Sequence, residues 1–286
     1  MHRAFAMPTA IAALLVFVPG TQAVSAAHPR FAYDRNRPFD LRLGTSQSND
    51  GVVRQRLTFD AGHGPKTGYW THPEGKGPWP VVLFSPGSGG DATSQLPDAD
   101  RLARRGIGSL TVDPPRVLVS CRSAADVRTY SAYVVGRRRA LDLIPHVPGA
   151  DSSRVAAVGF SFGSAVTAAL AGVDHRLRGA VIQSGRAHLS APIAAFCVSL
   201  LGPRKARAYR RAYSAIDPVY YVSHAAPSSL LFQNGTRDPI SPGADVAAYV
   251  RAASRPKEAR TYPAGHELDE RARADLDNWV VQLLSR

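Results

Sequence analysis

Residues 154–172 read RVAAVGFSFGSAVTAALAG, an apolar run, then a serine flanked at two residues on either side by glycine, then a stretch of small apolar residues. The run at 154–160 is short and valine-rich, which is typical of a buried strand, whereas 165–171 has a helical pattern. A strand, a tight turn and a helix thus follow one another here. The stretch predicts that Ser161 occupies the turn between them.

Apolar runs and helical stretches alternate on both sides of this unit, which is the signature of parallel βαβ units. Buried strands are expected at residues 80–84, 108–112, 179–183, 229–233 and 259–262, and helices at 98–105, 132–143 and 271–284. Earlier, residues 52–59 and 66–75 alternate in polarity and predict antiparallel strands at the edge of a mixed sheet. We therefore expect an α/β protein with a mostly parallel central sheet flanked by helices.

The segment at residues 190–226 breaks this alternation, and we interpret it as a cap or lid inserted between two core strands. It carries a cluster of basic residues and two tyrosines at helical spacing: Arg204, Lys205, Arg207, Arg210, Arg211, Tyr209 and Tyr213. Such a face could attract an anionic acyl chain. A solvated basic side with buried tyrosines is the more common arrangement and the one we favour.

Residues 1–27 have the layout of a cleaved signal peptide: a basic start at Arg3, an apolar stretch over 4–18 and small residues at 25–27. We expect one domain over residues 28–286 and a secreted, periplasmic or otherwise extracytoplasmic location. The only two cysteines, Cys121 and Cys197, would then lie in an oxidising compartment. There they either form a disulfide or remain free thiols, and their spacing gives no support to a zinc site.

The composition, 44% hydrophobic and 20% charged, is that of a globular protein, and the formal net charge is +13. This charge allows peripheral association with anionic surfaces, although we favour an arginine-rich composition with a solvated basic surface as its explanation. No nucleic-acid-binding motif accompanies it. We expect a monomer that binds no nucleic acid.

Ser161 lies in the pattern G-x-S-x-G at residues 159–163, and the predicted strand and helix give this short pattern its weight. The turn forces the serine into a strained backbone conformation, and the glycines avoid collisions where strand and helix pass. Its hydroxyl would project at a helix N-terminus, where a developing negative charge is favoured. The competing interpretation is a serine that only caps the helix.

A serine hydroxyl needs a base, and His266 follows the last predicted strand, where Gly265 is expected to let the loop turn back over the sheet. Asp238 follows the strand at 229–233 and is expected to orient the imidazole. The order serine, acid, histidine is the one found in hydrolases built on such sheets. Asp238 could instead cap a turn or the next helix, and Asp217 and Asp245 are poorer candidates because neither ends a predicted strand.

Acyl transfer passes through an oxyanion, which requires two preorganised donors. We assign them to the backbone N–H of Phe162 and of Ser88, with Gly87 and Gly89 as neighbours that could replace Ser88. The loop at residues 85–90, SPGSGG, lacks the ending of a P-loop and the spacing of a dinucleotide fingerprint. No metal ion or organic cofactor is expected.

Three blocks, at residues 154–172, 230–242 (LLFQNGTRDPISP) and 262–269 (YPAGHELD), together resemble the α/β-hydrolase superfamily. Within it the chain is similar to the dienelactone hydrolase-like and prolyl oligopeptidase-like branch. It departs from many relatives in having Ser-Pro-Gly-Ser in the loop at 85–88, and from dienelactone hydrolases in having serine rather than cysteine at position 161. The Ser-Pro-Gly loop looks more like that of secreted polyester hydrolases and platelet-activating-factor acetylhydrolase-like lipases.

This resemblance implies a serine hydrolase that cleaves small or polymeric carboxylic esters through an acyl-enzyme, with Ser161 as nucleophile, His266 as base and Asp238 as orienting acid. A serine peptidase or amidase using the same residues is the alternative among enzymes. An inactive binding module on the same scaffold is the alternative outside enzymes.

Overall fold

A central sheet organises the chain, and the computed structural model describes it for residues 29–116 and 119–285. The described residues form a nine-stranded sheet in the order β1-β2-β3-β5-β4-β6-β7-β8-β9. The strands are β1 (Arg42–Asn49), β2 (Val52–Asp60), β3 (Pro65–Pro73), β4 (Trp79–Ser85), β5 (Gly108–Val112), β6 (Ala150–Phe160), β7 (Gly179–Gln183), β8 (Ser229–Gly235) and β9 (Lys257–Tyr262). The expected signal peptide lies outside the described residues.

The first three strands pair antiparallel, and β3 pairs antiparallel with β5. From β5 through β4, β6, β7 and β8 to β9 every pairing is parallel. The expected mixed sheet with an antiparallel edge is therefore present. Strand β1 forms the outer edge, and all eight of its residues are exposed.

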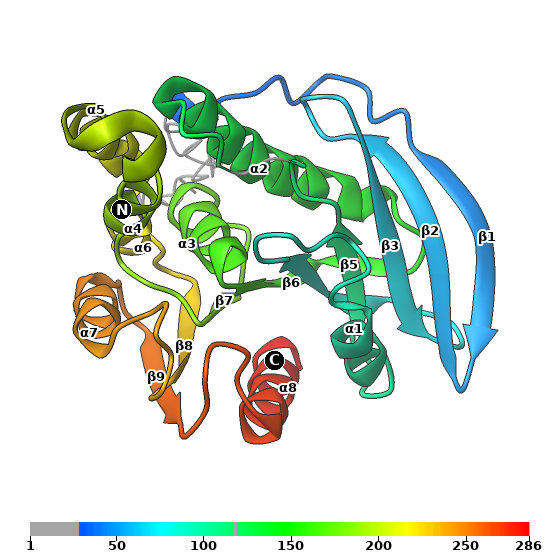
Figure 1. The fold of residues 1–286 in the computed structure, drawn as a ribbon. Coiled ribbons are helices and arrows are strands. Elements are labelled where there is room, and N and C mark those ends of the chain that lie inside the picture. Colours follow the sequence, from blue (N-terminus) through cyan, green and yellow to red (C-terminus); the bar gives the residue numbers. More distant parts are fainter. Residues whose placement is uncertain (1–28, 117–118, 286) are drawn as a thin grey trace, which may run out of the picture.

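Eight helices connect and cover these strands in the described ranges, and Figure 1 shows α2 and α3 on one face of the sheet and α1 and α8 on the other. Their bounds are α1 (Leu96–Ala103), α2 (Ser123–Leu143), α3 (Phe162–Val173), α4 (Ser190–Phe196), α5 (Val198–Tyr213), α6 (Pro218–Val222), α7 (Gly243–Ala252) and α8 (Glu270–Leu284). Short 3-10 turns occupy η1 (Pro29–Phe31), η2 (Ile144–His146) and η3 (Ser214–Ile216).

The two faces of the sheet are both apolar because successive side chains of a strand point to opposite sides. In β4, Val81 and Leu83 join the core on the α2 and α3 side, whereas Val82 and Phe84 pack with α1 and α8. A strand buried on both faces has the continuous apolar sequence that marked residues 80–84 as a core strand. Both layers hold the carboxyl ends of the parallel strands in a fixed row.

Within residues 29–116 and 119–285, no helix combines the length and the apolar character needed to cross a bilayer.

Helix α2 differs from the expectation, since it begins at residue 123 rather than near 132. Three consecutive arginines in it, Arg137, Arg138 and Arg139, are buried, with at most 5% of each residue exposed. Arg138 forms an ion pair with Asp174 at 3.2 Å, and Arg139 donates to backbone carbonyls that include that of Arg37 at 2.8 Å. Part of the positive charge expected on the surface is therefore inside the protein.

Candidate active site

Ser161 occupies the turn between β6 and α3, as expected, with φ 53° and ψ −117°. This backbone conformation is strained for a residue with a side chain. The two flanking glycines, Gly159 and Gly163, leave no space for a side chain. A Cβ on Gly159 would lie 2.3 Å from the carbonyl oxygen of Gly163, and one on Gly163 would lie 2.0 Å from that of Ser85. Strand, helix and the loop after β4 thus meet too closely for any side chain at these two positions.

Three side chains from separate loops form a continuous hydrogen-bonded chain. The Nε2 atom of His266 lies 2.8 Å from Oγ of Ser161, and Nδ1 of His266 lies 2.8 Å from Oδ2 of Asp238. Asp238 comes from the turn after β8 and His266 from the loop after β9. The structure therefore brings together the serine, the histidine and the acid that the sequence singled out.

The Asp238 carboxylate is held from both sides. One oxygen faces the imidazole, and the other accepts the N–H of Ile240 at 2.8 Å and of Ser241 at 3.2 Å. Its side chain is fully buried. Burial alone would raise the pKa of Asp238, but the hydrogen bonds from His266 and Ile240 and the nearby imidazole outweigh it, and the pKa is lowered. Asp238 is thus kept as an anion that fixes the imidazole with Nδ1 protonated.

The loop that carries His266 does not depend on Gly265 for its turn, contrary to expectation. Gly265 has no positive φ, and a Cβ there would meet nothing within 4 Å, so the glycine is not what lets the loop turn. The close approach is at Gly235, where a Cβ would lie 2.2 Å from the carbonyl oxygen of Gly265. Ser184, just after β7, donates its hydroxyl to the carbonyl of His266 at 2.5 Å. Sequence reasoning missed Ser184, because no motif marks it.

The two assigned N–H donors belong to the two segments that adjoin the serine. Phe162 is the first residue of α3, and the first four N–H groups of a helix have no acceptor within it. Ser88 lies in the exposed loop after β4, beside Gly87, whose added Cβ would lie 3.2 Å from Cβ of Ser161. The loop after β4 therefore passes directly over the serine.

The base of this loop is fixed from α2, by residues that the sequence did not reveal. The hydroxyl of Tyr133 donates to the carbonyl of Pro86 at 2.8 Å, and Nε of Arg137 donates to Oγ of Ser85 at 3.0 Å. Both side chains are buried. An arginine in a helix usually lies on the protein surface, so the sequence pattern around Arg137 gave no indication of this role.

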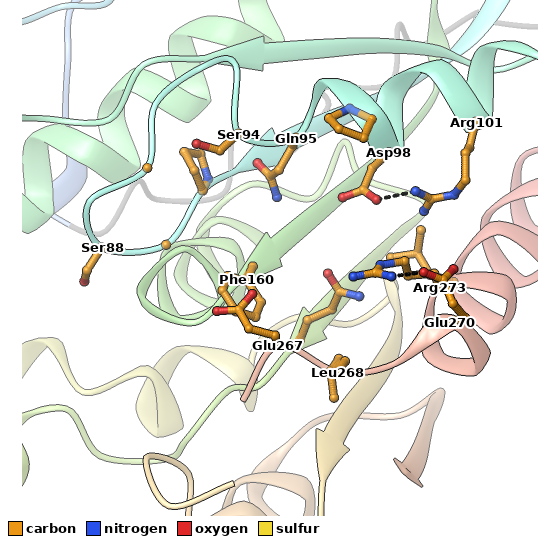
Figure 2. A pocket seen from close by; sticks show the side chains of 16 residues that line it. Ser88, Ser94, Gln95, Asp98, Arg101, Phe160, Glu267, Leu268, Glu270 and Arg273 are labelled. Atoms are coloured by element: carbon orange, nitrogen blue, oxygen red, sulfur yellow. Dashed lines mark hydrogen bonds and ion pairs between the residues drawn. The ribbon is translucent and has the colours of Figure 1, made fainter. Parts of the chain in front are cut away.

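A pocket of about 520 Å³ opens beside the triad. Its lining includes Ser88 and the residues adjacent in sequence to the serine and the histidine, Phe160 and Glu267. Figure 2 shows these at one end and two ion pairs, Asp98 with Arg101 and Glu270 with Arg273, at the other. The lining is therefore mixed, with charged side chains at that end and the apolar side chains of Phe160, Leu268 and Leu276 elsewhere.

The two poorer acid candidates have structural partners instead. Asp217 accepts the N–H groups of Leu189 and Ser190 at 2.7 and 2.8 Å and so fixes the start of α4. Asp245 lies 2.7 Å from Nδ1 of His188, forming a second histidine–aspartate pair. In the described part of the chain, no serine hydroxyl is hydrogen-bonded to the His188 ring.

The segment at residues 190–226 folds into α4, α5 and α6; α5 packs against α2, α6 against α3, and α4 against α5. Its basic side chains are exposed and its two tyrosines buried, the arrangement favoured above: Arg204, Lys205, Arg207, Arg210 and Arg211 against Tyr209 and Tyr213. The described lining of the pocket beside the triad includes none of its residues. A disulfide between Cys121 and Cys197 joins it to the loop before α2.

In the described ranges, no three histidine, cysteine, aspartate or glutamate side chains are grouped so as to hold a metal ion.

A family model described as "Esterase FrsA-like" matches residues 44–191, just over half of the chain. Esterase FrsA of Escherichia coli O157:H7 is 36% identical over 127 residues, which are 44% of this chain and 30% of that protein. The Escherichia fergusonii protein of the same name is 35% identical over the same length. The match thus spans less than a third of these curated relatives.

Solved structures show a similar arrangement over most of the chain. An acetyl xylan esterase from Paenibacillus sp. R4 has a TM-score of 0.73 and 20% identity, covering 85% of this chain and 89% of that one. The glucuronoyl esterase from Solibacter usitatus has a TM-score of 0.68 and 12% identity, covering 88% of each. At these identities the similarity establishes a common fold.

Proposed function

The chain belongs to the FrsA-like esterase family, with the α/β-hydrolase fold, and we propose that it hydrolyses carboxylic esters through an acyl-enzyme formed on Ser161. The observation that carries this proposal is the hydrogen-bonded chain from Ser161 through His266 to Asp238, with 2.8 Å at each step. These three hydrogen-bonded side chains lie at the ends of the parallel strands, beside a pocket.

In the first half of the reaction, Oγ of Ser161 attacks the ester carbonyl carbon while Nε2 of His266 takes the hydroxyl proton. The carbonyl oxygen becomes an oxyanion, which accepts hydrogen bonds from the N–H groups of Ser88 and Phe162. The tetrahedral intermediate then collapses. The bond to the alcohol oxygen breaks, and the alcohol leaves with the proton that His266 returns.

In the second half, water attacks the acyl carbon and gives a proton to His266. The bond to Oγ of Ser161 breaks, Oγ regains its proton, and the free acid departs. Throughout both halves Asp238 stabilises the imidazolium that forms and prevents the ring from adopting the other tautomer. The buried carboxylate can do so because its lowered pKa keeps it ionised.

The charged side chains of the pocket lining, among them Glu267, favour a short acyl group. A long aliphatic chain placed against them would remove their water without giving them a partner. We expect activity on p-nitrophenyl esters to decrease from acetate to octanoate.

The proposal includes export from the cytoplasm after cleavage of residues 1–27. The disulfide between Cys121 and Cys197 supports it, because disulfides persist chiefly in oxidising compartments.

The decisive experiment measures hydrolysis of p-nitrophenyl acetate and covalent labelling by a fluorophosphonate probe in wild type and in Ser161→Ala. We expect the variant to lose both, whereas Ser199→Ala, which changes an exposed serine of α5, should keep both. Residual hydrolysis at the wild-type rate in Ser161→Ala would reject the proposal. Faster cleavage of aminoacyl anilides than of matched esters would instead identify an amidase.

A further inference from the structure

A second cavity, of about 230 Å³, lies between α2, the start of β3 and the loop after β5. Among the described residues it shares no lining residue with the pocket beside the triad. Its charged or ionisable lining residues are His63, Lys66, Arg116 and Arg137, opposed by the single acid Asp113. The cavity is therefore lined predominantly by positive charge.

Arg137 lines the cavity and is almost completely buried, with 1% of the residue exposed. Its Nε atom donates to Ser85 at 3.0 Å, and its Nη2 atom donates to the carbonyl of Val112 at 2.7 Å. In the described part of the chain no carboxylate forms an ion pair with it; its Nη2 atom also donates to the hydroxyl of Tyr133 at 3.4 Å, and its guanidinium lies 4.6 Å from the centre of the Tyr133 ring. Burial lowers the pKa of Arg137, against the opposing effects of Tyr133 and Asp113. A buried cation without a directly paired carboxylate is costly, and an anion entering the cavity would relieve that cost.

Lys66 lines the wall of the same cavity and is partly buried. Its Nζ atom donates to the carbonyl of Pro114 at 3.0 Å, which leaves further ammonium protons for another acceptor. Burial lowers the pKa of Lys66, and the neighbouring Arg137 and Arg116 lower it further against the opposing effect of Asp113. The positive charges therefore act on one another across the cavity.

Asp113 does not neutralise this group. One of its oxygens accepts the backbone N–H of Ala92 at 2.9 Å, so part of its hydrogen-bonding capacity is directed away from the cations. The nearby side chain of Thr129 adds a hydroxyl group to the lining, whereas the hydroxyl of Tyr133 already donates to Pro86. Cations at fixed positions together with a hydroxyl form a donor set that binds a tetrahedral oxyanion.

We propose that this cavity binds a phosphate group, with Lys66, Arg116 and Arg137 as its ligands. Its volume is several times the roughly 30 Å³ that one water molecule occupies in the liquid, so the phosphate can be free or can belong to a small phosphomonoester. The cavity is separate from the pocket beside the triad, although Arg137 also holds the base of the loop after β4, and its existence does not depend on the proposed function.

The test is isothermal titration calorimetry of the full mature protein with inorganic phosphate, at an ionic strength held constant with sodium chloride. Lys66→Gln and Arg116→Gln should each weaken phosphate binding about tenfold or more, the effect of losing one charge-assisted hydrogen bond. Arg116 is exposed, so its replacement tests the proposal even if Lys66→Gln folds poorly.

Lys205→Gln is the matched control, because it removes the same charge from an exposed position on α5 and should leave phosphate affinity within about twofold. Titrations with glucose 6-phosphate and glucose distinguish a phosphate substituent from the free ion. Absence of phosphate binding to wild type would overturn the proposal. An equal loss of affinity in Lys205→Gln and in the cavity variants would also overturn it, since general attraction to a basic protein would then explain the binding.

Discussion

Replacing Gly163 by alanine is the sharpest test of how closely the catalytic turn is packed. The added Cβ would lie 2.0 Å from the carbonyl oxygen of Ser85 and 2.5 Å from that of Pro86. Ordinary contact begins at 3.4 Å, so helix and loop must separate by about 1.4 Å. Both obstructing atoms belong to the backbone and cannot rotate away as a flexible side chain would.

Two opposing effects determine how much Gly163→Ala changes the free energy of unfolding. Alanine is a better helix former than glycine by about 0.8–1.0 kcal/mol, which would stabilise α3. Overpacking in a closely packed core costs about 1–3 kcal/mol, and here the overlap is severe. We therefore expect net destabilisation of about 1–2 kcal/mol. Because the displaced loop carries the N–H of Ser88, a shift of about 1 Å should also reduce kcat/KM about 100-fold.

The assays are urea unfolding and hydrolysis of p-nitrophenyl acetate, with Gly243→Ala as the control. Gly243 is the first residue of α7, and a Cβ there would meet nothing within 4 Å, so its replacement should leave activity unchanged and should leave stability unchanged or raise it by up to about 1 kcal/mol. If Gly163→Ala retains wild-type stability and activity, the argument that strand, loop and helix require glycine at this crossing is refuted.

Three further outcomes follow from the structure. Asp238→Asn should lower kcat by up to about 10⁴-fold in steady-state assays, because the amide favours the wrong imidazole tautomer, and an unchanged kcat would contradict its orienting role. Asp174→Asn leaves the buried Arg138 without its partner and should cost about 3–5 kcal/mol at pH 7 in urea unfolding. Because the folded-state pKa of Asp174 is lowered, its stabilisation is present above the unfolded value of about 3.9, so the variant and wild type should converge as pH falls through the folded-state pKa. Replacing both Cys121 and Cys197 by serine should cost about 4–5 kcal/mol, the chain-entropy estimate for a loop of 76 residues, and an unchanged unfolding midpoint would count against it.

The parallel core and the relative positions of Ser161, Asp238 and His266 could be predicted from sequence for a common reason. Buried strands are continuous apolar runs, and parallel strands present their carboxyl ends at one edge, so residues that follow such runs must lie near one another. The expected α/β-hydrolase fold is confirmed, and the family within that superfamily is the FrsA-like one.

The residues that support the site could not be predicted, because their signals point the wrong way. Arg137 lies in a run of three arginines, which reads as a solvated surface, yet it is buried through hydrogen bonds to Ser85 and Val112. The first turns of α2 could not be predicted, because Ser123, Asp126 and Thr129 have weak helix propensity. Tertiary packing overrides that propensity in the folded protein. Ser184 acts on the backbone of a residue 82 positions away, a contact that no local pattern encodes.

The exposed strand β1 bears on how the protein behaves when concentrated. A long strand edge can recruit the same strand of another molecule and start a fibril. Here the edge reads GTSQSN over residues 44–49, and its pairing with β2 is interrupted between Leu43 and Ser46. The irregular hydrogen-bond ladder and the absence of apolar side chains over these residues both disfavour pairing with a second molecule. Replacing those residues by valine or isoleucine would remove this protection, and the exposed edge strand would then favour aggregation of the protein.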